Sequence, residues 1–459
     1  AMQTLRAITG SALDVEKAAT VEAAAEPEEK KSVYVQVPGS VRSLEALQKR
    51  LKPVAPLVSA TEMKISKAEY ARHVRKLCSV PLMGVDREKG AVVMRMDDAL
   101  DVLSAPPEDP AQVDQGLAHL ESYIETFRFG ETLDLKRVQM NVFEAFLHVV
   151  SAPFAHEFKK LKMSVDRYTI GPRGPKYLYI YGPSYNGKTN FLRLCLKIIT
   201  GRDMEPIAQE NFKKTSILAA RQYATVFPLA FDDVSIVTSI EPVLKHYWEV
   251  WWEEEVPAPQ LIMTSNQPNP KEWAETRIKR VNFDVKFDHG NPAGAQALSK
   301  VLGARTDFFR WFSYLHLKKL DHPGDEVLRN LVVDEARAAR EVIMELYELA
   351  GRPLPAYFPK RPVEQIYDVD LIEWLELIDT RVLSLEESGN KLVARAADTI
   401  PVYEVERYLR VLPQGVKAHR KGHSIIIEGK ESYLKWVFSA GSPVRRSFWR
   451  RLKEKLSGR

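Results

Sequence analysis

The sequence predicts an α/β fold built around a parallel sheet, and three stretches carry that prediction. The first, 177–199, runs from an aromatic and branched strand through a glycine loop into an apolar helix. The second and third are apolar strands within 226–233 and 259–266, and each of them ends in polar side chains. Because ligands of open parallel sheets bind at the carboxyl ends of the strands, we expect these polar residues to share one site.

Size and composition describe an ordinary globular protein. The chain has 459 residues, 45% of them apolar and 28% charged, which is enough for two to four domains and for a large core. Its two cysteines, Cys78 and Cys195, exclude a disulfide framework and a cysteine-rich zinc site, and they indicate a reducing, cytoplasmic setting. We expect no membrane span and no secretory signal. The net charge of +5 is by itself weak evidence for nucleic-acid binding.

Composition and turn residues divide the chain into six parts. The first part is rich in Ala, Glu and Lys and has no aromatic residue, which predicts a flexible or partly helical tail. Proline-rich stretches predict two linkers, one near residue 107 and one before residue 363. The expected parts are the tail at 1–31, a small mixed α/β region at 32–107, a helical bundle at 111–165, a phosphate-loop core at 166–320, a helix and linker at 321–362, and an α+β region at 363–459.

The elements before the phosphate loop follow from periodicity and turn residues. Alternation of apolar and polar residues predicts strands at 33–37 and 91–95, and turn residues at 85–90 predict a hairpin before the second strand. We can attach no chemistry to this region. Helical spacing of apolar residues predicts helices at 43–52, 67–77, 113–127, 133–152 and 155–163.

The stretch from Gly182 to Thr189 reads G-x-x-x-x-G-K-T between a strand and a helix, which is the context of a phosphate loop. The glycines let the backbone approach an anion, and the loop amides and helix N-terminus direct partial positive charge at it. Lys188 is expected to reach the β and γ phosphates of ATP, and Thr189 to hold Mg²⁺. A chance match in a glycine-containing loop is the alternative. The expected nucleotide-binding residues are Gly182, Pro183, Ser184, Tyr185, Asn186, Gly187, Lys188, Thr189 and Asn190.

Two strand ends downstream supply the remaining polar groups. Asp232 and Asp233 end an apolar strand, as a Walker B position requires, and we assign Asp232 to the metal and Asp233 to the attacking water. Asn266 ends the next apolar strand and is placed to touch the γ phosphate or the water. The alternative interpretation is that these residues simply begin turns. Their order after a phosphate loop favours the functional interpretation.

Basic residues at 276–280 lead into an alternating strand that ends near Phe287. An arginine here could reach the nucleotide of a neighbouring subunit, where it would offset charge in the transition state. We prefer Arg280 over Arg277 for this role. Both side chains could instead be solvated charges at a strand edge.

The last third of the chain predicts helices at 308–317, 334–350 and 401–409. After the last of these, a basic stretch at 416–423 precedes a strand at 424–428. A winged-helix arrangement and any other small α+β domain fit this pattern equally well. The basic end of the chain, 445–459, suits a helix that binds a nucleic-acid backbone, and it suits a solvated amphipathic helix equally.

Taken in order, GPSYNGKT, PLAFDD, LIMTSN and TRIKRVNFDVKF resemble the motifs of the superfamily 3 helicases of viruses and plasmids, which belong to the AAA+ ATPases. The resemblance covers residues 130–320, under half of the chain. It implies an α/β ATPase core preceded by a helical bundle, a homo-oligomeric ring that is commonly a hexamer, ATP sites between subunits, and motor action on DNA. By position, it also implies a role for each of four sets of residues. Lys188 and Thr189 take the phosphate role, and Asp232 and Asp233 take the metal role. Asn266 takes the sensor role, and Arg277 or Arg280 takes the finger role.

One stretch departs from that family, in which a hairpin with a basic tip usually grips DNA between the Walker B and Asn strands. Here 243–257 is acidic, which would repel phosphate. Its three tryptophans, Trp248, Trp251 and Trp252, could stack on bases, but such residues more often belong to a core or a subunit interface. Two functions stay open: a DNA-dependent oligomeric ATPase or helicase, and an ATP-gated assembly or signalling module that recruits a protein partner such as a nuclease.

Overall fold

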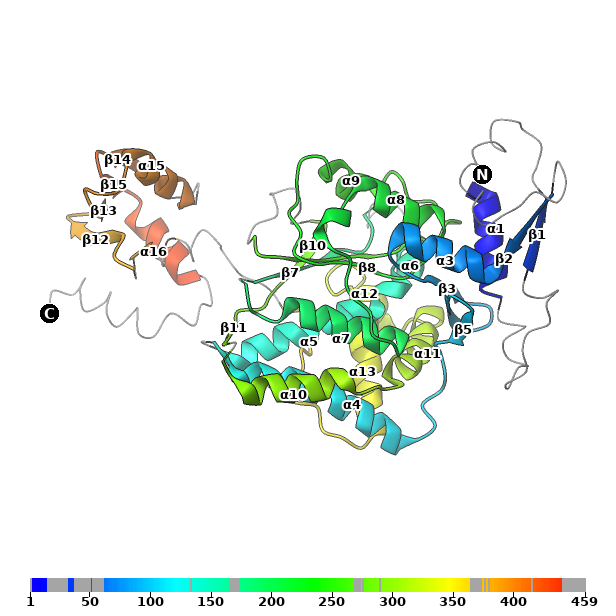
Figure 1. Ribbon diagram of the computed structural model, residues 1–459. Coiled ribbons are helices and arrows are strands. Elements are labelled where there is room, and N and C mark those ends of the chain that lie inside the picture. The colour runs from blue at the N-terminus through cyan, green and yellow to red at the C-terminus, as the bar shows by residue number, and fades with distance from the viewer. Residues whose placement is uncertain are drawn as a thin grey trace. The chain divides into compact units, whose positions relative to one another are not determined.

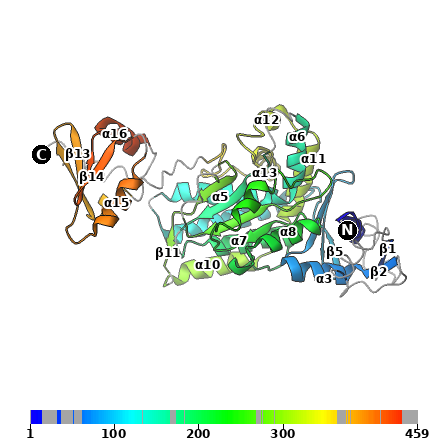
Figure 2. The ribbon, with the colours of Figure 1, turned by 90° about the horizontal axis from the view of Figure 1, so that it is seen from above.

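We describe the fold from a computed structural model, shown as ribbons in Figures 1 and 2. The chain divides into two compact units, 1–363 and 364–459, and each is described by itself. The structure describes residues 2–14, 32–36, 51, 62–132, 134–165, 173–182, 184–267, 274, 276–288, 290–363, 374, 377–378, 380–413 and 416–439.

A parallel four-stranded sheet forms the centre of the first unit, so the predicted α/β class is confirmed for this unit. Its strand order is β10-β7-β9-β8, and an isolated parallel bridge between Ile207 and Phe231 extends the β8 edge. Most residues of these strands are buried, because helices cover both faces. The bounds are β7 (Tyr177–Tyr181), β8 (Leu229–Phe231), β9 (Leu261–Ser265) and β10 (Ile278–Asn282).

Helices lie on both sides of this sheet. Figure 1 shows α8 (Lys214–Gln222) and α9 (Glu241–His246) on one side, and α5 (Leu135–Ser151) and α7 (Lys188–Thr200) on the other. In both ribbon views α5 and α7 lie side by side, and α5 packs on β7 and β10. The other helices of this part are α4 (Pro110–Glu125), α6 (Ala155–Val165), α10 (Pro292–Gly303), α11 (Phe308–Asp321), α12 (Asp325–Arg329) and α13 (Arg337–Leu349).

Capping explains where the observed helices differ from the predicted ones. Helix α4 begins three residues before the predicted Val113, because the Asp109 carboxylate accepts a hydrogen bond from the Ala111 amide at 2.9 Å and proline occupies the first turn. Asp134 caps α5 in the same way, so that helix begins at Leu135 rather than at residue 133. Helix α13 begins at Arg337 rather than at residue 334, since residues 331–333 and 335–336 form turns.

The N-terminal elements pack onto the same hydrophobic core as the sheet. The predicted tail contains a helix, α1, whose Leu5 and Ile8 are buried against this core. The predicted hairpin is present as β3 and β4, and the Met83 carbonyl accepts a hydrogen bond from the Val226 amide at 2.9 Å. Residues 15–31 and most of the predicted helix 43–52 lie outside the described residues. The elements are α1 (Met2–Ala12), β1 (Ser32–Gln36), β2 (Glu62–Ser66), α3 (Lys67–Cys78), β3 (Leu82–Asp86), β4 (Ala91–Met96) and β5 (Ala99–Val102).

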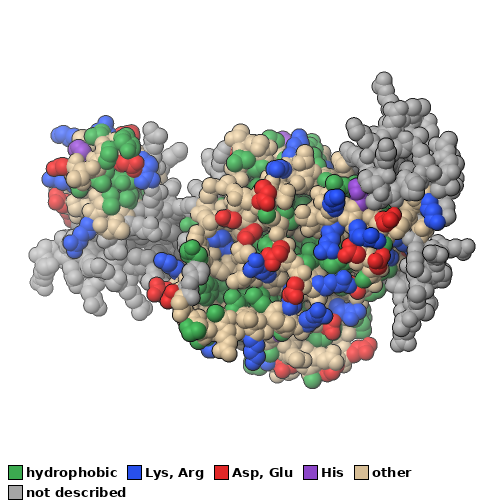
Figure 3. All heavy atoms as spheres, in the orientation of Figure 1, with side chains coloured by type: hydrophobic (Ala, Val, Ile, Leu, Met, Phe, Trp, Pro, Cys, Tyr) green, Lys and Arg blue, Asp and Glu red, His purple; other side chains and the backbone are tan. Residues whose placement is uncertain are grey.

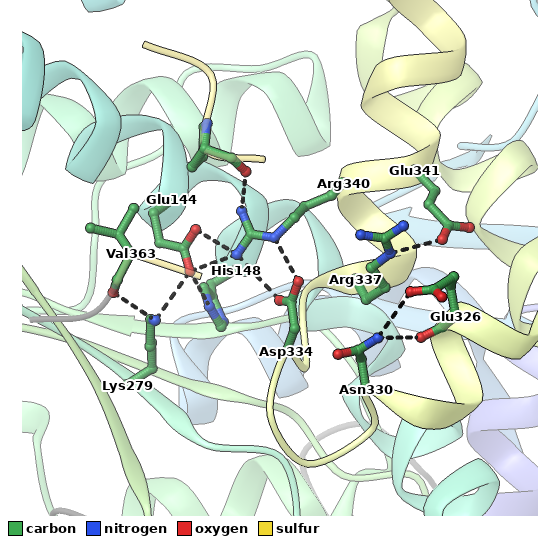
Figure 4. Close-up of polar contacts among 11 residues, drawn as sticks. Glu144, His148, Lys279, Glu326, Asn330, Asp334, Arg337, Arg340, Glu341 and Val363 are labelled. Carbon is green, nitrogen blue, oxygen red and sulfur yellow. Dashed lines mark hydrogen bonds and ion pairs between the residues drawn. The ribbon is translucent and has the colours of Figure 1, made fainter. Parts of the chain in front are cut away.

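A buried group of charged side chains joins α5, α13 and β10, and we call it the charge cluster (Figure 4). Arg340, only 1% exposed, donates to the Asp334 carboxylate from Nε at 2.9 Å and to Glu144 Oε1 from Nη2 at 2.8 Å. Its Nη1 donates to the Pro359 carbonyl at 2.7 Å. A buried cation is tolerated when carboxylates and carbonyls satisfy it in this way.

The strand β10 takes part in the charge cluster through Lys279. Its Nζ lies 3.2 Å from Glu144 Oε1 and donates to the Val363 carbonyl at 3.1 Å (Figure 4). Burial by itself raises the pKa of Glu144, but the hydrogen bond with His148 and the charges of Arg340 and Lys279 outweigh it and lower that pKa to about 2. The cluster therefore holds an ionised carboxylate in the interior.

The second unit is an α+β domain with a four-stranded antiparallel sheet in the order β12-β13-β15-β14. The helix followed by a hairpin with a basic tip is present as α15, β14 and β15, and Gly422 turns the tip with φ +61°. Within the described part of this unit, a hairpin of the strands β12 and β13 directly precedes α15. The basic end at 445–459 lies outside the described residues. The bounds are β12 (Leu383–Ser388), β13 (Lys391–Ala396), α15 (Val402–Val411), β14 (Ala418–Lys421), β15 (Ser424–Ile427) and α16 (Lys430–Ser439).

Both cysteines are buried in the first unit, as free thiols. Cys78 ends α3 and Cys195 lies in the middle of α7. Desolvation raises the pKa of Cys78 to about 12 and also raises that of Cys195. Within the described ranges, none of the helices has both the length and the apolar character needed to cross a bilayer.

Candidate nucleotide-binding site

The predicted phosphate loop lies between β7 and α7, at the carboxyl edge of the sheet. A Cβ at Gly182 would lie 1.5 Å from Asn186 Nδ2 and 2.9 Å from the Phe283 carbonyl oxygen, so only glycine fits there. Gly187 and Tyr185 have φ of +84° and +68°, the left-handed conformation that turns the loop into the helix. The loop therefore has the tight backbone that the motif predicts.

Lys188 lies at the centre of the site and is 6% exposed. Its Nζ donates to the Gly182 carbonyl at 2.6 Å, to Asn186 Oδ1 at 2.9 Å and to Asn266 Oδ1 at 2.9 Å. Desolvation lowers the pKa of Lys188 to about 8, although the carboxylates of Asp232 and Asp233 act in the opposite direction. An anionic phosphate would compensate this desolvated ammonium group.

The Walker B acids differ in their surroundings. Asp232 accepts hydrogen bonds on both carboxylate oxygens, from Thr264 Oγ1 at 2.5 Å and from Thr189 Oγ1 at 2.7 Å. Asp233 has a left-handed backbone with φ +51°, and its carboxylate accepts a bond from Asn266 Nδ2 at 2.6 Å. Asp232 is thus held beside the N-terminus of α7, and Asp233 lies towards Asn266.

The strand order explains why these residues meet. Because β9 lies between β7 and β8, its end places Asn266 between Lys188 and Asp233. The amide of Asn266 bonds to both: its oxygen accepts from Lys188 and its nitrogen donates to Asp233. A continuous row of polar side chains therefore crosses the carboxyl edge of the sheet.

The oxygen atoms of Thr189 and Asp232 suit Mg²⁺, because a hydroxyl and a carboxylate lie 2.7 Å apart beside the phosphate loop. Magnesium is usually bound through one or two such protein groups together with substrate phosphates and water. Among the described residues, no group of three or more His, Cys, Asp and Glu side chains could hold a metal by itself. The site thus fits a metal that binds together with a nucleotide.

The other predicted loop residues have different positions. Asn186 is buried, and its Nδ2 donates to the Phe283 carbonyl at 3.0 Å, which ties the loop to the end of β10. Ser184 is exposed, and Tyr185 is 60% exposed. Asn190 lies on α7, and its side chain accepts a bond from Arg193 at 3.3 Å. Pro183 lies outside the described residues.

The two candidate finger arginines have different surroundings in their own chain. Arg277 precedes β10 at the amino edge of the sheet, where its guanidinium forms an ion pair with Glu249 at 2.8 Å. Arg280 lies in the middle of β10, pairs with Tyr179 across the strands, and stacks over the ring of Tyr181 at 5.0 Å. Their role towards a neighbouring subunit stays a prediction.

The stretch between β8 and β9 contains α9 and turns, and no strand occurs among its residues 232–260, all of which are described. Trp248 is buried and donates to Gln260 Oε1 at 3.2 Å, in agreement with the preferred core interpretation. Trp252 donates to His156 Nδ1 at 3.2 Å, and Lys214 Nζ lies 5.5 Å from the ring centre of Trp251. The tryptophans are thus engaged within the protein.

Thr264 is the site residue that sequence reasoning missed. It is fully buried in β9, and its hydroxyl also accepts a bond from the Asp233 amide at 2.8 Å. The available signal was its position two residues before Asn266, because alternate residues of a strand face the same side. A threonine in a strand is also a common packing residue, so the sequence alone does not distinguish the two roles.

Comparison with known proteins agrees with this geometry. Residues 99–269 match a family described as the Aq_aa27 P-loop NTPase domain. The match includes the phosphate loop, the Walker B acids and Asn266, and it ends before the two arginines. No curated protein matches the chain.

A solved structure described as "SCCmec type IV Cch - active helicase" is similar at 10% identity and a TM-score of 0.30, over 64% of this chain and 70% of that one. A likeness this weak carries no argument about activity. The family match and the site geometry agree on the coarser conclusion that this chain contains a P-loop NTPase domain.

Proposed function

We propose that this chain is a Mg²⁺-dependent ATPase whose hydrolysis drives a homo-oligomeric ring, most simply a hexamer, on DNA. The observation that carries the ATPase part is the row Lys188, Asn266 and Asp233 beside the pair Thr189 and Asp232. Hydrolysis needs a cation for the phosphates, oxygen ligands for the metal and an acceptor for the proton of the attacking water, and these residues supply all three side by side.

Each residue then has one task. Lys188 exchanges its bonds to loop oxygens for bonds to the β and γ phosphates, which brings an anion to a desolvated cation. Asn266 lies where the γ phosphate and the attacking water meet, and Asp233 polarises that water as an acceptor of its proton. When bound at Thr189 and Asp232, Mg²⁺ neutralises the charge that develops between the phosphates.

The ring and the DNA partner are supported by the resemblance of four motifs to superfamily 3 helicases. The position of Arg277 supports action on a neighbouring subunit, since it lies at the opposite end of the sheet from the phosphate loop of its own chain. Glu249 would have to release Arg277 for that purpose. Of the two, Arg280 stays the preferred finger on the sequence pattern.

An ATP-gated assembly module that recruits a protein partner is the second candidate, and the stretch between β8 and β9 favours it. Of its glutamates, Glu253 and Glu255 form ion pairs with Arg221 and Arg6, and Lys245 pairs with Glu241. Cationic and anionic side chains intermingle on the face shown in Figure 3. A basic loop that would grip DNA is not found among residues 232–260.

Steady-state ATPase activity distinguishes the two candidates. We would measure it without nucleic acid, with single-stranded DNA and with duplex DNA, using Lys188→Ala as the blank. Stimulation by DNA that disappears at high salt supports the motor. Hydrolysis that is indifferent to DNA supports the assembly module, and activity no higher than the blank removes the basis of both proposals.

A further inference from the structure

The hydroxyl of Thr264 connects the two Walker B acids, which have otherwise separate surroundings. Its Oγ1 donates to Asp232 Oδ1 at 2.5 Å and accepts from the Asp233 amide at 2.8 Å. A hydroxyl can do both at once, because it has one proton and two lone pairs. No other side chain described at this edge of the sheet bonds to both residues.

The position of Thr264 in the sheet explains this contact. The last residue of β8, Phe231, pairs with Met263, so Thr264 lies one step beyond the end of that pairing. Beyond Phe231 the chain leaves β8, and two further bonds tie the residues that follow to the end of β9. The Thr264 carbonyl accepts a hydrogen bond from the Val234 amide at 2.8 Å, and Ser265 Oγ donates to the Val234 carbonyl at 2.7 Å. The end of β9 therefore fixes the backbone that carries both acids.

Each acid depends on this support in a different way. The carboxylate of Asp232 is held at both oxygens, by Thr264 on one side and by Thr189 on the other, so its orientation is fixed before a metal arrives. Asp233 has a left-handed backbone, which is unfavourable for a residue with a side chain. The bond from its amide to Thr264 stabilises that conformation and directs the carboxylate towards Asn266.

We infer that Thr264 is a positioning residue for hydrolysis, and that it acts through its hydroxyl rather than through its shape. The inference rests on the proposed ATPase function and adds a residue to it. Thr264 orients Asp232 for Mg²⁺ and Asp233 for water, and it makes no contact with the phosphate loop in the bonds described here. Its loss should therefore impair metal use and turnover while nucleotide binding without metal stays intact.

Two substitutions separate the hydroxyl from the shape. Thr264→Val keeps the branched side chain but removes the hydroxyl, and it leaves the Asp233 amide without its acceptor. Thr264→Ser keeps the hydroxyl. Groups that orient metal ligands typically change metal affinity or activity by roughly ten- to a hundredfold when they are removed. We expect the valine variant to show a fall in kcat of that size with KM for ATP changed less than threefold (about the scatter of such constants), and the serine variant to stay near wild type.

A binding measurement gives a readout that does not depend on turnover. We would titrate Mg²⁺ against the affinity for a fluorescent, slowly hydrolysed ATP analogue, and compare the Mg²⁺ concentration at half effect. This concentration should rise roughly tenfold or more in Thr264→Val and stay unchanged in Thr264→Ser. Thr225→Val is the matched control, because Thr225 is equally buried and its hydroxyl also donates and accepts, but its partners are the Pro81 carbonyl and the Met83 amide rather than either acid. Thermal unfolding shows whether each variant is folded.

The outcomes are distinct. The inference is wrong if Thr264→Val uses Mg²⁺ as the wild type does, or if the serine and valine variants are equally impaired, because then the hydroxyl is not the active feature. It is also wrong if the valine variant loses analogue affinity in the absence of Mg²⁺. A wild type without ATPase activity above Lys188→Ala would instead contradict the proposed function, and the Mg²⁺ titration would still test whether Thr264 orients Asp232.

Discussion

Two of the cations that the first unit buries, Lys188 in the phosphate loop and Arg340 in the charge cluster, have different surroundings. Arg340 bonds to two carboxylates, which outweigh desolvation and raise its pKa. The three bonds described for Lys188 end on neutral oxygens, and desolvation lowers its pKa to about 8. A cation that bonds directly to buried carboxylates contributes to the fold, whereas a desolvated cation beside the phosphate loop is prepared for an anionic ligand.

Replacement of Arg340 should give the largest effect on stability. Arg340→Met leaves the buried Asp334 without its cation and Glu144 with Lys279 as its remaining close cation, which costs about 3–5 kcal/mol of the free energy of unfolding. Urea denaturation followed by circular dichroism measures this loss. Arg329→Met is the control, because Arg329 forms only exposed pairs in α12 and should change little. Equal effects of the two substitutions would show that the charge cluster is not structural.

Replacement of Lys188 should have little effect on the stability of the nucleotide-free protein and a large effect on its stabilisation by ATP. Without nucleotide, Lys188→Ala should unfold near the wild-type temperature, since it removes a charge that burial disfavours. ATP at about a hundred times its Kd should stabilise the wild type by about 2.7 kcal/mol, and the variant should lose most of that gain. Thermal unfolding with and without a slowly hydrolysed ATP analogue tests this. A variant that keeps the full ligand-induced shift would contradict the assigned role of Lys188.

Acid should weaken the charge cluster through Glu144. The pKa of Glu144 in the folded protein is lowered to about 2 from its usual value of 4.5, so the stability it contributes is present above pH 4.5 and is lost as the pH falls towards 2. We expect the free energy of unfolding to decrease over this range by about 2–3 kcal/mol more in the wild type than in Glu144→Gln. Urea denaturation at several pH values measures the difference, and parallel pH profiles would disprove the assignment.

The smallest effect should come from the glycine that shapes the phosphate loop. In Gly182→Ala the new methyl group must displace Asn186, which also orients Lys188. Such overpacking typically costs about 1–3 kcal/mol, and here it should appear partly as weaker ATP binding. Gly303→Ala, at a glycine with open space around it, serves as the matched control in a nucleotide titration. Unchanged affinity in Gly182→Ala would mean that the loop adapts freely.

The nucleotide site could be predicted in large part because its residues follow one another locally. The glycines of the loop, the two acids and Asn266 each come at the end of an apolar strand, and parallel strands bring such ends together. The role of Thr264 depends on which strand lies beside β8, and the order of strands in a sheet cannot be read from the residues near Thr264 in the sequence. Sequence reasoning placed these strands but not their order in space.

The charge cluster could not be predicted at all. Glu144, Lys279 and Arg340 come from two helices and a strand far apart in the chain, and each residue alone resembles a solvated surface charge. The pairing of Arg277 with Glu249 was missed for the same reason. A partly helical tail was predicted for the region of α1, but its packing was not, because Leu5 and Ile8 find their partners only in the folded core.

The two buried thiols give the protein a built-in pair of chemical probes. A thiol reacts with an alkylating reagent only when it is exposed and ionised, so Cys78 and Cys195 should label only when α3 or α7 opens. Because α7 begins at the phosphate loop and α3 does not, a bound nucleotide should slow the labelling of Cys195 far more than that of Cys78. Mass spectrometry of the two peptides would thus report, in one unmodified chain, which part of the molecule the ligand closes.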